Sequence, residues 1–172
     1  SENEALMRIS PENIDEIMHN TVDPEAEKSA ILLATGLPAG PGGATGQIVF
    51  TAEVAEEWKQ QGKQVILVRN ETSPEDVHGM HVASGILTAK GGMTSHAALV
   101  ARGWGKCCIV GCSSLYINIE NRTLNIGNHS LKEGDWVTLN GTLGNTYLGQ
   151  LSLKQPDLDQ NKDFNKLMLL AD

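Results

Sequence analysis

The strongest constraint on the fold is an alternation of short apolar runs with helical segments between residues 47 and 110. The apolar runs have the length and composition of strands, and they are Gln47–Phe50, Gln64–Val68, Gly85–Thr88 and Cys107–Val110. The segments between them have helical character, near Glu53–Gln60, Pro74–Met80 and His96–Arg102. This alternation predicts a mixed α/β domain.

After Gly111 the pattern changes to short strands separated by turns. The strands predicted there are Thr123–Ile126, Asp135–Leu139 and Thr146–Leu151, and the turn pairs are Gly127-Asn128, Glu133-Gly134 and Asn140-Gly141. Such pairs favour the tight turns that join neighbouring strands. A β-rich end therefore closes the compact unit near residue 152.

The beginning of the chain has the pattern of short helices. Ser10-Pro11 and Asp23-Pro24 each place a capping side chain before a proline at the first helical position. The segment is amphipathic but too small to form a domain. We therefore predict that residues 1–35 are an N-terminal helical linker segment.

Two further segments have the composition of connections. The run Gly36–Gly43 is rich in glycine and proline, which do not continue a helix and resist a central strand, so it is interpreted as a linker or hinge. Residues 153–172 are predicted to be a C-terminal linker, with a second pivot at Pro156–Lys162. The domain itself is then assigned to residues 36–152, and the chain is expected to be a segment of a larger protein.

Composition excludes several classes of protein. With 172 residues, 40% hydrophobic and 20% charged, the chain is expected to be a soluble globular domain with no membrane span and no secretory signal. The net charge is -8 and the 13 Lys and Arg residues are scattered, so we expect neither nucleic acid nor a membrane surface as a partner. Three closely spaced cysteines form a poor disulfide framework, and reduced, partly buried thiols are expected at Cys107, Cys108 and Cys112.

The most informative stretch surrounds His96. Gly91 and Gly92 follow a predicted strand, Thr94 and Ser95 can cap a helix, and His96 falls in the first turn of that helix. A helix N-terminus offers unpaired N–H groups and the positive end of a dipole, which stabilise a phosphoryl group. An uncharged imidazole has a lone pair that can attack phosphorus. We therefore predict His96 as a nucleophile, with the glycines allowing close approach and the two hydroxyls bonding the phosphate or fixing the imidazole tautomer.

The stretch Gly91–Lys106 resembles the phosphohistidine signature of the phosphoenolpyruvate-utilising enzymes. Within that superfamily it is similar to the pyruvate, phosphate dikinase family, as Met93 and the ending Gly103–Lys106 indicate. Phosphoenolpyruvate synthase and enzyme I of the bacterial sugar phosphotransferase system usually carry Arg at the position of Met93. The similarity extends to Thr72–Val77, Thr35–Gly42 and Ala5–Arg8, and thus covers most of the chain.

The resemblance implies a swivelling β/β/α phosphohistidine domain between a nucleotide-binding domain and a pyruvate/phosphoenolpyruvate-binding barrel. The family converts ATP, pyruvate and phosphate into AMP, phosphoenolpyruvate and pyrophosphate, with Mg²⁺ at the partner-domain sites. His96 is then expected to carry the phosphoryl group from the nucleotide to pyruvate, while the isolated domain does not turn over. Thr94 matches the position that plant members phosphorylate to switch the enzyme off. The parent enzyme is expected to be a homodimer in the cytoplasm or a plastid.

Two alternatives stay open for the function. One is the equivalent domain of phosphoenolpyruvate synthase or enzyme I, which uses the same chemistry. The other is a non-catalytic swivelling module that binds a partner through the Gly-Gly helix start. Labelling of the histidine by phosphoenolpyruvate separates these classes.

Other candidate residues carry weaker signals. His78 and His81 do not have the spacing of zinc ligands, so no metal site is predicted. Glu75 and Asp76 fit a helix cap better than a general acid–base pair. Arg102 is expected to be a surface or domain-contact charge rather than a phosphate ligand. Trp104 fits either a core or a docking contact.

Overall fold

The computed structural model describes residues 20–154. The helical elements are α3 (Pro24–Lys28), α4 (Ala52–Gln60), the 3-10 turn η1 (Pro74–Asp76), α5 (Val77–Val82) and α6 (His96–Trp104). The strands of the first half are β1 (Thr21–Val22), β2 (Leu32–Thr35), β3 (Leu37–Gly40), β4 (Gly43–Val49), β5 (Val65–Arg69), β6 (Gly85–Thr88) and β7 (Cys107–Val110). The remaining strands are β8 (Leu115–Asn118), β9 (Thr123–Ile126), β10 (His129–Lys132), β11 (Trp136–Asn140), β12 (Asn145–Leu148) and β13 (Leu153–Lys154).

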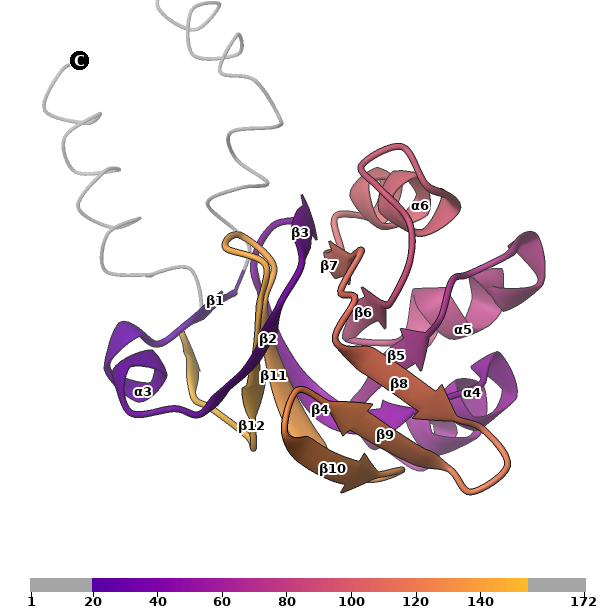
Figure 1. The fold of residues 1–172 in the computed structure, drawn as a ribbon. Coiled ribbons are helices and arrows are strands. Elements are labelled where there is room, and N and C mark those ends of the chain that lie inside the picture. Colours follow the sequence, from indigo (N-terminus) through magenta and orange to yellow (C-terminus); the bar gives the residue numbers. More distant parts are fainter. Residues whose placement is uncertain (1–19, 155–172) are drawn as a thin grey trace, which may run out of the picture.

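An eight-stranded sheet is the centre of the fold. Its order is β2-β12-β11-β4-β5-β6-β7-β3, and the four strands from β4 to β7 run parallel while the others pair antiparallel. The helices α4, α5 and α6 cover one face of the parallel strands, and the small antiparallel sheet β10-β9-β8 lies against the other face (Figure 1). This layering confirms the predicted β/β/α fold class.

Strand β5 shows why the sequence builds two layers around one sheet. Its first four residues are buried, and their side chains alternate between the two faces, as in any strand. Val65 and Leu67 belong to the core beneath the helices, together with Met80. Ile66 and Val68 belong to the core beneath the small sheet. A continuous apolar run is therefore the expected sequence for a strand that is covered on both faces.

The run Gly36–Gly43 is not the linker or hinge that its composition indicated. Residues 37–40 form β3, an edge strand that pairs with β7, and Gly43 begins β4 inside the sheet. The edge position tolerates Pro38, because one side of the strand makes no ladder hydrogen bonds. A Cβ on Gly40 would overlap the carbonyl oxygen of Lys106. Here glycine allows two strands to approach closely.

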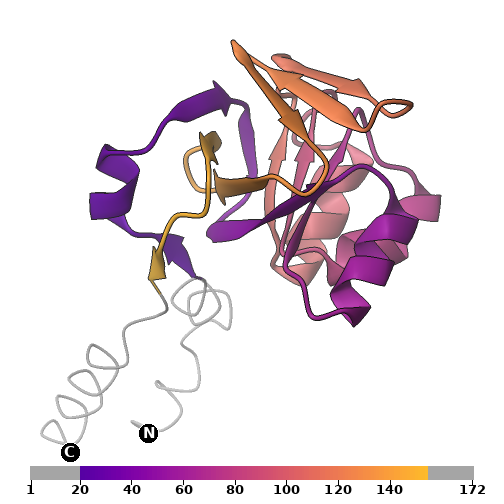
Figure 2. The ribbon, with the colours of Figure 1, turned by 90° about the horizontal axis from the view of Figure 1, so that it is seen from below.

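Residues 20–35 pack against the rest of the domain. Asp23 caps α3 and Pro24 is its first residue, which confirms that prediction. Glu27 accepts hydrogen bonds from Tyr147 at 2.6 Å and from Asn140 at 2.7 Å, so α3 is tied to the sheet. Strand β1 pairs with β13, and the two ends of the described chain therefore lie side by side (Figure 2).

Several predictions fall at the limits of the described residues or inside the core. The predicted helix start at Ser10-Pro11 and the predicted pivot Pro156–Lys162 lie outside the described residues. The domain boundaries at 35 and 152 stay predictions. All three cysteines are free and buried rather than partly exposed. No helix within residues 20–154 is both long and apolar enough to cross a membrane.

Candidate functional site

His96 is the first residue of α6, as predicted. Ser95 is the N-cap, and its hydroxyl accepts a hydrogen bond from the N–H of Ala98 at 3.4 Å. The chain reaches this cap through a turn in which the N–H of Ser95 donates to the carbonyl of Gly92 at 3.0 Å. Gly91 has a φ of 100°, a conformation that side chains with a Cβ rarely adopt. The glycine turn and the hydroxyl cap thus set where the helix begins.

The start of α6 lies where the parallel strands end. The loop after β5 and the loop after β6 meet there, because the carboxyl ends of parallel strands share one edge of a sheet. A pocket of about 240 Å³ opens between them, and its lining includes Glu71, Thr72, Lys90, Gly91 and His96. The imidazole is half-buried, so it is held by neighbours yet reachable from outside.

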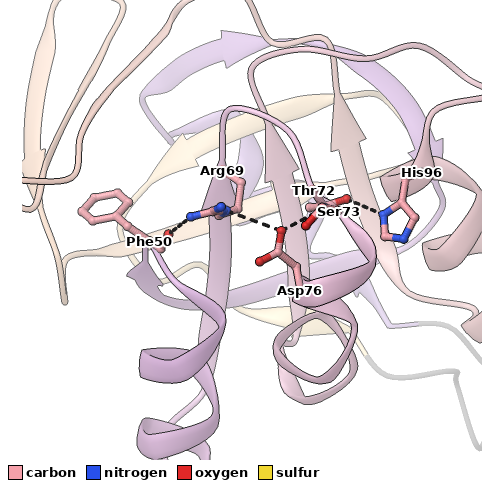
Figure 3. Close-up of polar contacts among 6 residues, drawn as sticks. All are labelled: Phe50, Arg69, Thr72, Ser73, Asp76 and His96. Carbon is pink, nitrogen blue, oxygen red and sulfur yellow. Dashed lines mark hydrogen bonds and ion pairs between the residues drawn. The ribbon is translucent and has the colours of Figure 1, made fainter.

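Thr72 is the residue that contacts the imidazole. Its hydroxyl oxygen lies 2.9 Å from Nδ1 of His96, and Thr72 itself is 9% exposed (Figure 3). When Nδ1 carries the proton of a neutral imidazole it donates to this hydroxyl, and the lone pair is left on Nε2. Thr72 thus occupies Nδ1, and Nε2 is the ring nitrogen that it leaves uncontacted.

Sequence reasoning did not assign Thr72 to the site. Its neighbourhood, Thr72–Val77, carries part of the family resemblance and is otherwise typical of a helix cap. The hydroxyls predicted to fix the tautomer were those of Thr94 and Ser95. Ser95 instead caps the helix, and Thr94 is exposed on the loop before it. The 24-residue separation between Thr72 and His96 hid the contact, since no short-range pattern joins them.

An ion pair between the buried carboxylate of Asp76 and the partly buried side chain of Arg69 lies behind Thr72 (Figure 3). Asp76, 6% exposed, accepts a hydrogen bond from the N–H of Ser73 at 2.9 Å through Oδ2. The same oxygen lies 3.7 Å from Nε of Arg69, whose Nη1 donates to the carbonyl of Phe50 at 3.0 Å. This agrees with Asp76 as a cap rather than as one of a general acid–base pair.

The remaining candidates take positions around α6. Arg102 is exposed, which agrees with the predicted surface charge, and it donates through Nη2 to the carbonyl of Met93 in the loop before His96. Trp104 is 41% exposed and meets the ring of His81 edge-on, with 4.9 Å between centroids. A core role for Trp104 is thereby wrong, and the docking role stays a prediction.

A larger pocket of about 290 Å³ lies near the other end of α6. Its lining includes Trp104, Lys106 and the turn between β3 and β4, beside Asn20, the first described residue. The ammonium of Lys106 donates to the carbonyl of Ala83 at 2.6 Å, and burial lowers the pKa of Lys106, with the nearby charge of Lys59 adding to the effect. Lys106 thus binds the protein itself, and the candidate chemistry stays at His96.

No metal centre is formed by the residues that the structure describes. Among positions 20–154, no group of three or more His, Cys, Asp and Glu side chains is placed to hold an ion. Asp76, the buried carboxylate near the site, is committed to its pair with Arg69.

A model of a known protein family matches the central part of the chain. Residues 61–144 match the family described as PEP-utilising enzyme, mobile domain. This interval includes both Thr72 and His96. The chain carries the mobile domain of the phosphoenolpyruvate-utilising enzymes. The resemblance inferred from the stretch around His96 is thereby confirmed.

Curated relatives extend the likeness beyond the mobile domain itself. The chain is 53% identical over 169 residues to "Pyruvate, phosphate dikinase, chloroplastic" of Mesembryanthemum crystallinum, across 98% of this chain and 18% of the relative. It is 51% identical over 176 residues to "Pyruvate, phosphate dikinase 2" of Zea mays, across 97% of this chain and 20% of the relative. The chain thus spans about a fifth of the length of the curated relatives that it matches.

A solved structure is similar to part of the chain. An NMR solution structure of enzyme I overlaps 60% of this chain and 35% of that chain, with 24% identity and a TM-score of 0.36. This likeness is too weak to carry an argument about function.

Proposed function

We propose that this mobile domain is the phosphoryl carrier of a pyruvate, phosphate dikinase, and that His96 is the residue phosphorylated. The parent reaction is ATP, pyruvate and phosphate to AMP, phosphoenolpyruvate and pyrophosphate. The observation that carries the proposal is an accessible imidazole at the start of α6, with Nδ1 bonded to Thr72 and Nε2 left for reaction. The relatives named as this enzyme support the choice within the superfamily.

Each transfer step forms one bond to phosphorus and breaks another. The lone pair of Nε2 attacks the β-phosphorus of the nucleotide, the P–N bond forms, and the P–O bond to AMP breaks with its electrons leaving on the AMP oxygen. The bound pyrophosphoryl group then passes its terminal phosphoryl to inorganic phosphate, which gives pyrophosphate and leaves a phosphohistidine. The enolate oxygen of pyruvate attacks this phosphorus, and Nε2 leaves with the P–N electrons. Nδ1 keeps its proton against Thr72 throughout.

The surroundings of His96 favour an anion beside the ring. The first turn of α6 presents backbone N–H groups and the positive end of a nine-residue helix. Lys90, an exposed residue, lines the same pocket. Gly91 and Gly92 place no side chain in the turn before His96, and Thr94 is exposed in the same turn. These groups support Gly91, Gly92, Thr94 and Ser95 as the phosphate-supporting set.

The outer face of α6 is proposed to meet the substrate-bearing domains. Leu99 follows His96 by three residues, so it lies on the same side of the helix, and it is 56% exposed. Around Gly103, one turn further, no atom of the described part lies within 4 Å of the place where a Cβ would stand. This face is apolar and carries no side chain at Gly103. Beside His96, it suits close packing against a nucleotide-binding domain and then against a pyruvate-binding barrel. The pairing of β1 with β13 brings the first and last described residues together, which supports a tether that leaves this face free to swing.

Thr94 is proposed as the regulatory phosphorylation site. It is exposed and lies two residues before His96, so a kinase can reach it. A phosphate there would repel the phosphoryl group that His96 receives. Magnesium is proposed at the sites of the partner domains, and no step assigned to this domain passes through a metal. The relatives named chloroplastic favour a plastid location, and the homodimer of the parent enzyme stays a prediction.

The test uses the intact parent enzyme and radiolabelled phosphoenolpyruvate. Wild-type enzyme is expected to take up one label per domain that is lost in acid and kept in base, as a phosphoramidate is. His96→Asn is expected to lose the label while retaining the fold by circular dichroism. Label that persists in His96→Asn, at another residue, would overturn the proposal.

The alternatives are separated by measuring, on the same enzyme, which co-substrate it needs and where the label goes. Enzyme that needs inorganic phosphate as co-substrate is a dikinase, whereas enzyme that uses water in its place is a phosphoenolpyruvate synthase. Enzyme I would pass the label from His96 to a carrier protein instead. Wild-type enzyme without any label would favour the non-catalytic binding module.

A further inference from the structure

We propose that Arg69 and Asp76 are positioning residues for the phosphorylated histidine, because their ion pair holds the loop that carries Thr72. The inference rests on the proposed function, since it concerns the reactivity of His96. Neither residue touches the imidazole, and each acts through Thr72.

Thr72 lies in irregular backbone between β5, which ends at Arg69, and η1, which begins at Pro74. No helix or sheet ladder sets the position of its hydroxyl, yet that hydroxyl lies 2.9 Å from Nδ1 of His96. A hydrogen bond weakens when its geometry shifts, so the loop must be held from both ends to present the oxygen consistently.

Asp76 holds the far end of the loop. Its carboxylate accepts from the N–H of Ser73 at 2.9 Å, and its own N–H donates to the carbonyl of Ser73 at 2.9 Å. Two hydrogen bonds therefore fix the residue that directly follows Thr72. The peptide that joins Thr72 to Ser73 is planar, so holding the N–H of Ser73 also holds the carbonyl and the Cα of Thr72.

Arg69 fixes Asp76 in turn. Its Nε lies 3.7 Å from the buried carboxylate, and its Nη1 donates to the carbonyl of Phe50, just beyond β4. The guanidinium therefore joins the ends of two parallel strands to η1 (Figure 3). Nε is buried and has no hydrogen-bond acceptor among the described residues, so the pair is not an optimal stabilising bond.

An ion pair with a buried carboxylate and a partly buried guanidinium is weak evidence for stability but can specify one arrangement of a loop. The near end of the loop is held by two backbone hydrogen bonds. The N–H of Ala89 donates to the carbonyl of Arg69, and the N–H of Lys90 donates to the carbonyl of Asn70. The side chains of Arg69 and Asp76 supply the remaining hold. The pair thus keeps Thr72 in place, so that Nδ1 holds the proton and Nε2 is the reactive nitrogen.

The test measures the rate at which phosphoenolpyruvate labels His96 in the intact parent enzyme. Thr72→Val is expected to slow labelling about 10-fold, because the imidazole loses its partner and its orientation. Asp76→Ala is expected to slow it by a similar factor. The double variant is expected to be about as slow as either single variant, since both changes remove the same contact.

Conservative variants keep the test decisive where Asp76→Ala does not fold. Asp76→Asn keeps an acceptor for Ser73 and is expected to restore part of the labelling rate, and Arg69→Lys is expected to fall between wild type and Arg69→Met. The control is Glu27→Ala, which removes two tertiary hydrogen bonds that anchor α3. It is expected to lower stability without changing the labelling rate.

Two results would overturn the inference. The first is a folded Asp76→Asn or Asp76→Ala enzyme that labels at the wild-type rate. The second is a double variant whose loss is the product of the two single losses, because the residues would then act independently. Either result leaves the proposed function intact as long as wild-type enzyme is labelled and His96→Asn is not, so the two failures are distinguishable.

Discussion

Two glycine-rich segments of this domain have opposite roles. The run 36–43 lies inside the eight-stranded sheet, where a Cβ on Gly40 would overlap the carbonyl of Lys106. The pair Gly91-Gly92 lies at the start of α6, where a Cβ on Gly92 would meet no atom of the described residues within 4 Å. In the first segment glycine is needed by neighbours within the fold. In the second segment the fold itself would accept a side chain at Gly92, so packing does not require a glycine there.

The contrast separates a glycine that lets two strands pack closely from a glycine that leaves space open to solvent. From composition alone, the run 36–43 was interpreted as flexible and the pair Gly91-Gly92 as a site of close approach. Close approach applies to both, but the approaching partner differs: for Gly40 it is strand β7, and for Gly92 it is proposed to be the phosphate and its donor domain. Four predictions test this distinction.

The largest effect is expected on the thiol of Cys107, which lies behind the first segment with Sγ 3.4 Å from the carbonyl of Gly42. Burial raises its pKa to about 12, with the neighbouring Cys108 adding to the effect. We expect a thiol reagent at pH 8 to modify Cys107 at least ~1,000-fold more slowly in the folded parent enzyme than after unfolding. Peptide mapping by mass spectrometry measures this.

Rapid modification of Cys107 in folded enzyme would mean that the segment opens as a hinge. The pH dependence gives a second check. The unfolded thiol loses its proton above 9.0, whereas the folded one holds it to about 12. The free energy of unfolding is therefore expected to fall as pH rises between these values, because the unfolded state binds fewer protons there.

Gly40→Ala is expected to have the next largest effect. The added methyl group has to displace the backbone of Lys106, so β3 is expected to separate from β7 at a cost of about 3 kcal/mol. Hydrogen exchange in the parent enzyme is expected to show roughly 100-fold weaker protection of both strands. Unchanged protection would show that the edge pairing adapts easily.

Gly92→Ala serves as its matched partner, with the same added group at the open segment. We expect unchanged protection from hydrogen exchange, because nothing in the described part obstructs the methyl group. Labelling of His96 by phosphoenolpyruvate is expected to slow about 10-fold, since the methyl group lies in the approach of the phosphate. A normal labelling rate would remove Gly92 from the phosphate-supporting set.

Gly103→Ala is expected to have the smallest effect, and of opposite sign on stability. Alanine favours a helix over glycine, so α6 is expected to gain roughly 0.5 kcal/mol, seen as slower amide exchange in that helix. Phosphoryl transfer in the parent enzyme is expected to fall a few-fold if this face docks closely. Faster exchange in α6 would contradict the helix argument, and full activity would remove Gly103 from the docking face.

Much of the central fold was predictable from local pattern. The predicted bounds of β6, β7 and β9 agree with the structure, and α4 and α6 begin within one residue of prediction. These elements carry their own apolar run or cap. Strands β2, β3, β8 and β10 were missed because they lie at edges or in a small sheet, where pairing partners rather than composition make a strand.

The site divides in the same way. His96, its hydroxyl cap at Ser95 and the turn at Gly91 are neighbours in the chain, so helix-capping rules and the local motif were enough to place His96 at a helix start. Thr72 and the pair Arg69–Asp76 come from another βα connection. Thr72 contacts the imidazole, with the pair behind it, because parallel strands bring their carboxyl ends to one edge of the sheet. No rule about nearby residues can anticipate a contact made across that edge.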